Sequence, residues 1–285
     1  MGLLFDRAIE VVVFAGGKSY TIRDLHITFD ILATRRSKPN QAKIGIYNLS
    51  ETSRNLLEEK HQGIEFKAGY QKEPVLIFRG TTNNIVNRRA APDWYTEIYA
   101  GDGQKEFNSA HFNKAYAAGT PVKQILRDLT NALGLPSEID DQTVGDVLAA
   151  GLALSGRVKD CLDQVTADYG LAWSIQHGTV EIVVEGEPPV KDSSAVVLRA
   201  DTGLIGSPEL TEDGVKVRSL LNPAIRPSRL IKIESQDANP SFGKLMEKAK
   251  PKRNANGIYI VDVAHYQGDN FGGPFDVTAE SKFRT

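Results

Sequence analysis

The chain has 285 residues and a mass of 31.2 kDa, 41% of its residues are apolar, and its formal net charge is −2. A chain of this length and apolar content can bury a substantial core and is expected to divide into two or three domains. The near-neutral charge argues against a generally basic nucleic-acid-binding protein or attachment to an anionic membrane. Asp6, Arg7 and Glu10 interrupt the apolar start, and no other run reaches membrane-span length, so we expect a soluble protein made in a cytoplasm, without membrane insertion.

The first part, residues 1–105, is expected to be a strand-rich domain. Apolar and polar residues alternate with the period of a half-buried strand, the apolar ones being Ile27, Phe29, Ile31 and Ala33. A turn at 37–40 contains proline and asparagine, and a second alternating run follows at 42–46. The two runs predict an antiparallel pair of strands.

A short helix is predicted next, from Ser50 to about Gln62. Ser50 is a good N-cap, and Glu51 places a negative charge in the first turn, where the helix dipole favours it. Leu56 and Leu57 are expected to face the core. The alternation then resumes at 64–68, which indicates a further strand.

The middle of the chain changes period. Residues 106–118 are polar and contain glycine, so we expect an extended connection, followed by a small α+β insert domain at 119–185. Apolar stripes predict one helix at about 120–133, ended by Gly134, and a second helix capped by Ser155. Two alternating runs then flank His177 and Gly178, which is the signature of a β-hairpin.

The last part, residues 194–285, is expected to be a second strand-rich domain. Strands are predicted at 214–221 and 229–235, with Pro223 and Pro227 preventing simple continuous pairing between them. The run at 258–263 has apolar residues on both faces, as expected of a covered strand. The final run at 275–283 separates cleanly into a polar and an apolar face.

Residues with catalytic or metal-binding potential lack the companions that such chemistry requires. Gly17-Lys18-Ser19 is not a phosphate-binding loop, since Val12 stands where that motif needs its first glycine; a hairpin turn is the better interpretation. The histidines show neither an HExxH spacing nor paired cysteines nearby; they are His26, His61, His111, His177 and His265. Asp140 and Asp141 read as solvated loop carboxylates. Cys161 lies on a helical apolar stripe and reads as a buried structural thiol. We therefore expect no catalytic, cofactor-binding or metal-binding residues.

Two polar signals also have a simpler explanation. Asn48-Leu49-Ser50 matches a glycosylation acceptor, but without a secretory signal it is only the helix cap described above. The basic run 244–254 contains four lysines and one arginine with few acids, and contact with nucleic acid or an acidic protein surface is one interpretation. No aromatic residues interleave the lysines, so a solvated loop is favoured.

Several stretches resemble baseplate hub proteins of contractile-tailed bacteriophages. The run ITFDILATRRSKPNQAKIGIYNLSETSRNLL is similar to the N-terminal region of these proteins. Further stretches occur in the order that such hub proteins show: GTPVKQILRDLTNALGLP, YGLAWSIQHGTVEIV, SLLNPAIRPSRLIKIES and GIYIVDVAHYQGDNFGGPFDVT. The resemblance covers most of the chain.

The resemblance implies a β-rich α+β fold, with two tail-tube-like antiparallel β-barrel domains around a helix-helix-hairpin insert. It implies a non-enzymatic structural virion protein in the tail baseplate. As a homotrimer it would present six barrels to the hexameric tail tube protein on one side and meet the trimeric central spike protein on the other. Other baseplate proteins would be further partners, and DNA would pass through the channel without specific binding. No cofactor is implied.

Two alternatives stay open from the sequence. One is a tail-associated cell-wall hydrolase, although the region 119–185 is short for a lytic module. The other is the equivalent hub of a non-viral contractile injection machine. In a phage hub, whose channel lets DNA pass, a strongly basic lining would hold the duplex, so we expect 244–254 to lie away from the lumen.

Overall fold

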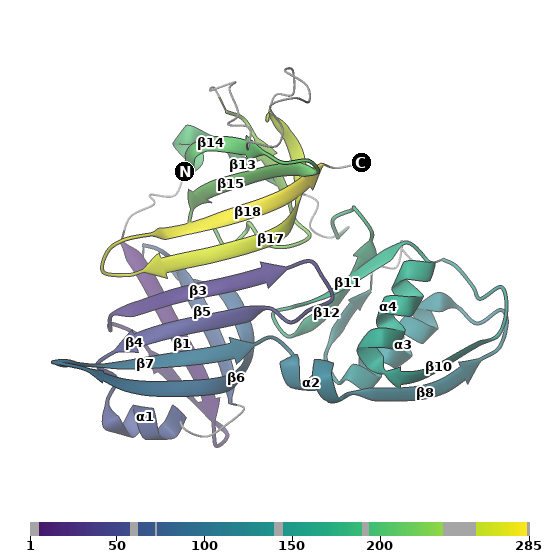
Figure 1. Cartoon of the computed structure of the whole chain (residues 1–285), viewed down its shortest axis with the longest axis horizontal. Coiled ribbons are helices and arrows are strands. Elements are labelled where there is room, and N and C mark those ends of the chain that lie inside the picture. The colour runs from purple at the N-terminus through teal and green to yellow at the C-terminus, as the bar shows by residue number, and fades with distance from the viewer. Residues whose placement is uncertain are drawn as a thin grey trace.

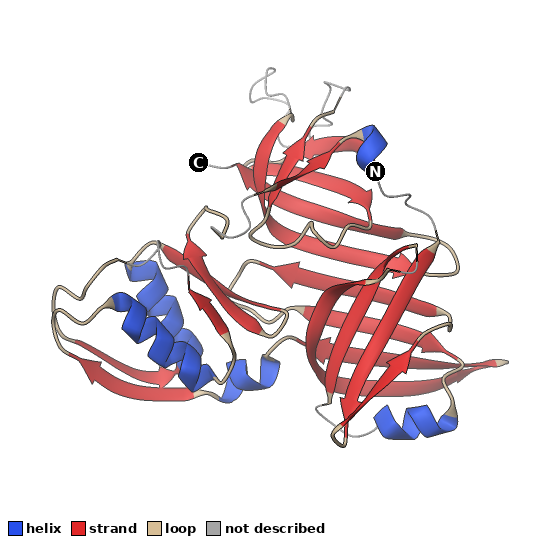
Figure 2. Cartoon of the chain, turned by 180° about the vertical axis from the view of Figure 1, so that it is seen from behind, coloured by secondary structure: helices blue, strands red, loops and turns tan. Residues whose placement is uncertain are grey.

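The structure, a computed structural model, describes residues 6–57, 62–71, 73–139, 145–189, 194–235 and 255–283. One large curled sheet forms most of the molecule, and a smaller α+β unit lies beside it (Figure 1). Seen from behind, the strands at the back of the sheet cross those at the front at an angle (Figure 2). The β-rich class expected from the sequence is confirmed.

The large sheet takes strands from both ends of the chain. The first part supplies β1 (Arg7–Ala15), β2 (Lys18–Ile22), β3 (Ile27–Thr34), β4 (Gln41–Tyr47), β5 (Gly63–Tyr70), β6 (Val75–Ala90) and β7 (Asp93–Gly101), with helix α1 (Glu51–Leu57) after β4. The last part supplies β13 (Ala195–Leu198), β14 (Leu204–Leu210), β15 (Gly214–Leu220), β16 (Leu230–Ile233), β17 (Gly257–Asp269) and β18 (Phe275–Phe283), with the 3-10 helix η2 (Ala200–Thr202) before β14.

The strand order differs from two closed barrels. Neighbours run β14-β15-β18-β17-β3-β4-β7-β6-β5-β1-β2, while β16 pairs with the first residues of β17 and β13 pairs with β16. Within the described residues no ladder joins the ends β2 and β14. The expectation of two closed barrels is therefore corrected to one open sheet, because β17 uses its second half to continue the sheet into β3.

The ladder between β17 and β3 joins the two ends of the chain. It runs antiparallel from Val263 opposite Thr34 to Asp269 opposite Thr28. Gly268 is required there, because a Cβ atom on it would lie 2.3 Å from the ring of Phe29. The Phe29 ring packs against Phe66 and Phe275, with centroid distances of 4.8 and 5.7 Å. One hydrophobic core thus includes residues of both parts.

Local predictions in the first part hold where the structure describes them. The alternating residues of β3 are buried and point into the core, as expected. The hairpin turn predicted at Gly17-Lys18-Ser19 is confirmed as the turn between β1 and β2, with Gly16 and Gly17 both at positive φ. The Ser50 hydroxyl accepts a hydrogen bond from the Ser53 amide at 3.2 Å, which confirms the N-cap. Helix α1 is described to Leu57, and the rest of the predicted helix lies outside the described residues.

The smaller unit, which we call the insert, comprises the elements from α2 to β12. They are α2 (Gln104–Ser109), β8 (His111–Tyr116), α3 (Val122–Leu133), β9 (Ser137–Ile139), β10 (Leu152–Arg157), α4 (Val158–Asp168), β11 (Leu171–Gln176) and β12 (Thr179–Val184). Its buried apolar residues form a second core, separate from that of the large sheet. The predicted hairpin is confirmed as β11 and β12, with His177 and Gly178 at positive φ in its turn.

Two predictions about the insert are wrong. Residues 106–118 are not an extended connection, because they contain most of α2 and all of β8, and Phe107 and Tyr116 belong to the insert's core. Ser155 does not cap a helix: it lies in β10, opposite Asn113 of β8, and α4 begins only after Arg157. The apolar pattern alone could not show that strand pairing extends up to the helix start.

Candidate functional site

One side of the sheet presents paired polar side chains to solvent. We call it the front face: the outward-pointing residues of β15, β18, β17, β3, β4 and β7, with Arg88 of the adjoining strand β6. Because strand residues alternate between faces, these are the residues that do not enter the core. The register places Asp276, Gln267, Asp30, Lys43 and Tyr99 in one row across five strands. The row crosses from the last part of the chain into the first without a break.

Glu97 is the most enclosed carboxylate of the front face. Its side chain is 4% exposed and pairs with Lys43 at 2.8 Å and with Arg88. The side chains of Lys43 and Arg88 are 46% and 58% exposed. Lys43 also lies over the ring of Tyr99, with the ammonium 5.7 Å from the centroid. The bases therefore lie outermost and the carboxylate lies beneath them.

A second enclosed carboxylate lies on β18, beside exposed polar pairs. Asp276 is 5% exposed and pairs with Arg218 at 2.5 Å, while Lys216 lies 3.3 Å from Glu280. Asp30 accepts hydrogen bonds from His265 at 2.8 Å and from Gln267 at 3.0 Å. Burial alone would raise the pKa of Asp30, but these two hydrogen bonds outweigh it and hold the pKa below its usual value. Asp30 is therefore ionised at neutral pH.

One edge of the front face is aromatic. The imidazole of His26 stacks on Tyr47 with a centroid distance of 4.3 Å, and Tyr47 contacts Tyr95 at 4.7 Å. Tyr95 lies flat across the sheet because Gly45 has no side chain; a Cβ there would be 2.1 Å from the Tyr95 hydroxyl. His26 is also bonded to Asp269 at 3.0 Å. Aromatic side chains are enriched in protein interfaces.

The back layer of the sheet carries a second charge network, on β1 and β5. Glu10 pairs with Lys67 at 2.9 Å and with Arg23, and Glu65 pairs with Arg79 at 2.8 Å and Lys67 at 3.7 Å. Burial would raise the pKa of Glu10, but its bonds to Lys67 and Arg23 lower it overall. This network contains three bases and two acids, and so has an excess of positive charge.

The junction between the insert and the sheet is the second notable site. The Asn40 side chain, which follows the turn between β3 and β4, donates to the Ile175 carbonyl at 2.9 Å and to Gln176 Oε1 at 3.1 Å. In return, Gln176 Nε2 donates to the Thr34 carbonyl at 2.8 Å. Asn40 and Gln176 are buried, so these bonds are shielded from water.

Asp102 and His177 meet at the turn of the insert's hairpin. Asp102 is fully buried and accepts the Gly178 amide at 2.7 Å; burial raises its pKa to about 7, despite the amides of Gly178 and His177. The His177 ring bonds to the Ile77 carbonyl at 3.0 Å, and burial, with the nearby charge of Arg226, lowers its pKa to about 4. His177 is therefore neutral at neutral pH, whereas Asp102 keeps its proton to a higher pH than an exposed carboxyl group does.

A bidentate ion pair fixes the same hairpin to the last part of the chain. Arg229 donates to both carboxylate oxygens of Glu181, at 3.2 and 3.0 Å, and the two side chains are 6% and 9% exposed. Parallel hydrogen bonds of this kind define an orientation as well as a contact. The insert is thus held to both parts of the sheet.

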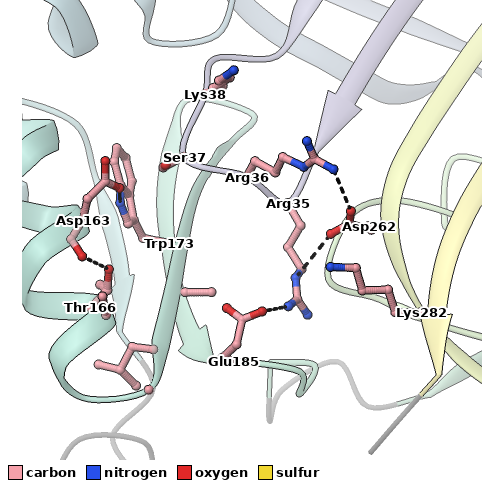
Figure 3. A pocket seen from close by; sticks show the side chains of 14 residues that line it. Arg35, Arg36, Ser37, Lys38, Asp163, Thr166, Trp173, Glu185, Asp262 and Lys282 are labelled. Atoms are coloured by element: carbon pink, nitrogen blue, oxygen red, sulfur yellow. Dashed lines mark hydrogen bonds and ion pairs between the residues drawn. The ribbon is translucent and has the colours of Figure 1, made fainter. Parts of the chain in front are cut away.

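A cavity of about 590 Å³ opens beside this junction (Figure 3). Trp173 and Asp163 line the insert side, while Arg35, Asp262 and Lys282 line the sheet side. Arg35 is 5% exposed and donates to Glu185 at 2.5 Å, although its Nη1 atom has no hydrogen-bond partner among the described residues. Arg35 thereby ties the turn after β3 to the end of the insert.

The residues singled out from the sequence do not converge. His26, His177 and His265 each bond a different partner, and His111 bonds the Ser109 carbonyl. His265 contacts Asp30, a partner that the sequence did not indicate. His61, Asp140, Asp141 and the run 244–254 lie outside the described residues.

Cys161 is buried on the stripe of α4, as expected. Burial, with the charge of Asp160, raises the pKa of its thiol, so the thiolate nucleophile is disfavoured. In the part of the chain that the structure describes, no cluster of three or more potential ligands could hold a metal ion. No described helix is long and apolar enough to cross a membrane.

The fold is that of tail proteins from phage-like machines. A 43 kDa tail protein of prophage MuSo2 from Shewanella oneidensis is similar over 97% of this chain and 98% of its own, with a TM-score of 0.64 and 10% identity. A tail protein from Neisseria meningitidis MC58 gives a TM-score of 0.63 and 9% identity, covering 98% and 97%. The Escherichia coli c3393 protein, a component of the type VI secretion system, gives 0.60 and 11%, covering 91% and 76%.

A family model described as baseplate hub gp41 matches residues 8–281, and the chain belongs to this family of baseplate hub proteins. The resemblance noted from the sequence is therefore confirmed. Among proteins with curated descriptions, none matches the sequence. The family is one of structural tail components, in agreement with a sheet whose polar residues pair with one another.

Proposed function

We propose that the chain is a trimeric baseplate hub that adapts a hexameric tail tube to a trimeric spike and lines the channel through which DNA passes. The observation that carries the proposal is the ladder between β17 and β3. It places the strands of the last part beside those of the first part in one wall. Three such chains would supply six wall segments around a threefold axis, which would reconcile the two symmetries.

The domain limits expected from the sequence belong to this proposal. Residues 1–105 and 194–285 would be the two tube-like units, although their strands share one sheet. Residues 119–185, together with α2 and β8, would be an accessory unit outside the wall. The bonds of Asn40, Asp102 and Arg229 to the insert's hairpin support a fixed position for it beside the wall.

Ring closure would bring the first part of one chain against the last part of the next. β2 and β14 each have a strand neighbour on one side only within the described sheet. β14 contains Pro208 and a register shift between Ile205 and Glu209, features that block regular pairing along an edge. The contact would therefore be made through side chains as well as backbone, and should bury more than about 1,000 Å².

The charge pattern of the front face supports the proposal that this face lines the channel. Its paired charges cross both parts of the chain without a break, as a continuous lining requires. The basic run 244–254 would lie away from the channel under this proposal, since a duplex would be held there by phosphate contacts.

Assembly with partner proteins tests the proposal. The purified chain, its tail tube protein and its spike protein would be mixed, and the products examined by mass photometry and electron microscopy. We expect a threefold ring with two wall segments per chain, stacked between tube and spike; partner binding can drive closure even if the free chain is monomeric. A monomer indifferent to both partners, or a ring with one wall segment per chain, would contradict the proposal.

The hub of a contractile injection machine is a second candidate, because the fold also matches the type VI secretion component of Escherichia coli. The same experiment separates the two, since the ring should bind the tube protein of only one kind of machine. That the chain is not a hydrolase stays a prediction. Loss of turbidity of purified cell walls at low protein concentration would overturn it.

A further inference from the structure

We infer that the carboxylates of the front face mask its bases, so that duplex DNA passes over this surface without being held. This inference rests on the proposed function, in which the front face lines the channel. It assigns a role to particular residues, namely Glu97 and Asp276. The surface is suited to the passage of a polyanion, namely duplex DNA.

The geometry of the pairs carries the inference. Glu97 and Asp276 lie almost fully enclosed beneath Lys43, Arg88 and Arg218, whose side chains are about half exposed. A phosphate approaching the face would meet the bases first. Each base already has a carboxylate within 4 Å, however, so a new phosphate contact would have to compete with an existing ion pair.

The charge balance of the two sides of the sheet agrees with this reading. On the front face, the five acids equal the five lysines and arginines in number; the acids are Glu97, Asp276, Glu280, Asp30 and Asp269, and the bases are Lys43, Arg88, Arg218, Lys216 and Lys282. On the back layer three bases share two acids. The side without excess positive charge is the one that would face DNA.

Magnitudes show why compensation matters. Every phosphate neutralised by a base contributes about 0.9 to the slope of log affinity against log salt concentration. Three unmasked bases per chain, repeated around a threefold channel, would make roughly nine contacts, and a duplex would then be held tightly at low salt. A masked lining keeps the number of released counterions small. The duplex would therefore pass along the lining rather than bind to it.

The test uses the full-length chain and a fluorescently labelled 20-base-pair duplex. The front variant carries Glu97→Gln and Asp276→Asn, which removes two negative charges and unmasks Lys43, Arg88 and Arg218. The matched control carries Asp128→Asn and Asp160→Asn on the insert. It makes the same change in net charge and releases Lys114 and Arg157, which pair with those acids at 2.6 and 2.9 Å.

We expect the front variant to bind the duplex at least tenfold more tightly than the unmodified chain at 50 mM salt, with the salt slope steeper by about 2 to 3. The control should bind within threefold of the unmodified chain. Equal binding by front variant and control, or tight binding by the unmodified chain, would overturn the inference. Thermal unfolding checks that each variant is folded, and Glu97→Gln alone serves if the double variant is not.

Failure of this inference is distinguishable from failure of the proposed function. The binding assay does not depend on ring formation, whereas electron microscopy of rings with the same duplex shows where DNA lies. A front variant that binds DNA as a free chain but holds it outside the ring would contradict the channel assignment and leave the masking intact.

Discussion

The front face and the junction with the insert use the same kinds of side chain but differ in where the basic partner lies. On the front face, Glu97 is enclosed while Lys43 and Arg88 reach water. At the junction, both Glu181 and Arg229 are withdrawn from water. A base that reaches water can be rehydrated when its partner is lost, whereas a buried one cannot. The first arrangement sets a surface property, and the second fixes the position of the insert.

The largest effect is expected from breaking the buried pair at the junction. Glu181→Gln should lower the free energy of unfolding by about 3 to 5 kcal/mol, because the buried guanidinium of Arg229 loses its bidentate carboxylate. Urea unfolding measures the loss, and hydrogen exchange should locate it in the β11–β12 hairpin. The double variant Glu181→Met, Arg229→Met should lose less than the single one. A single variant with native stability would show that the pair does not hold the insert.

The next effect concerns pH, because Asp102 and His177 titrate in opposite directions. The folded chain keeps the proton on Asp102 up to about pH 7, so between about pH 4 and 7 this group makes stability fall as pH rises. His177 is neutral in the folded chain above about pH 4, so between about pH 4 and 6.5 it makes stability rise with pH. Each contribution is on the order of 3 kcal/mol, and the two nearly cancel.

Single variants should separate these two contributions. Asp102→Asn should unmask a rise in stability from pH 4 to 6.5, and His177→Asn, which suits the positive φ of the turn, should unmask a fall. The charges of Arg79, Arg226 and Arg229 are present in both variants and do not titrate in this range. Urea unfolding at pH 4.5, 5.5 and 6.5 measures the slopes. Slopes of the same sign in both variants would contradict this account.

A smaller effect is expected where the two parts of the sheet join. Gly268→Ala places a Cβ against the ring of Phe29 and should cost about 1 to 3 kcal/mol through overpacking. Combining it with Phe29→Leu should recover part of the loss. Gly272→Ala is the control, since nothing lies within 4 Å of its Cβ position. Equal stability of the Gly268 and Gly272 variants would show that β17 does not pack on β3 as described.

The smallest effect on stability should come from the front face. Glu97→Gln should change the free energy of unfolding by less than about 1 kcal/mol, because Lys43 and Arg88 remain hydrated. The measurement is urea unfolding beside that of Glu181→Gln. A loss as large as that of Glu181→Gln would remove the distinction between the two regions.

The sequence predicted local elements better than the way they combine. Period-two alternation located β3, and the apolar stripes located α3 and α4, because burial imposes those periods directly. It did not show that β17 continues the sheet into β3, since that ladder joins residues more than 200 positions apart and depends on tertiary packing. Nor did it show that β10 runs up to the start of α4, which made Ser155 look like a cap.

The junction was missed for a related reason. Asn40, Asp102 and Gln176 are ordinary polar residues next to turns, and only the fold brings them together. One signal was available: Asp102 follows a strand whose alternate residues are apolar, at a position where a carboxylate would be enclosed. The sequence also gave no indication that His265 pairs with Asp30, which lies on the adjacent strand β3.

The most direct test of the central claim is a high-resolution electron-microscopy map of the hub assembled on its tail tube. The account predicts a threefold ring whose channel is lined by β15, β18, β17, β3, β4 and β7 of each chain, with Asp30, Lys43 and Gln267 facing the channel. It also predicts that β17 and β3 of one chain remain paired. A channel lined by the insert or by the back layer with Glu10 and Glu65, or a ring in which β17 and β3 are separated, would contradict it.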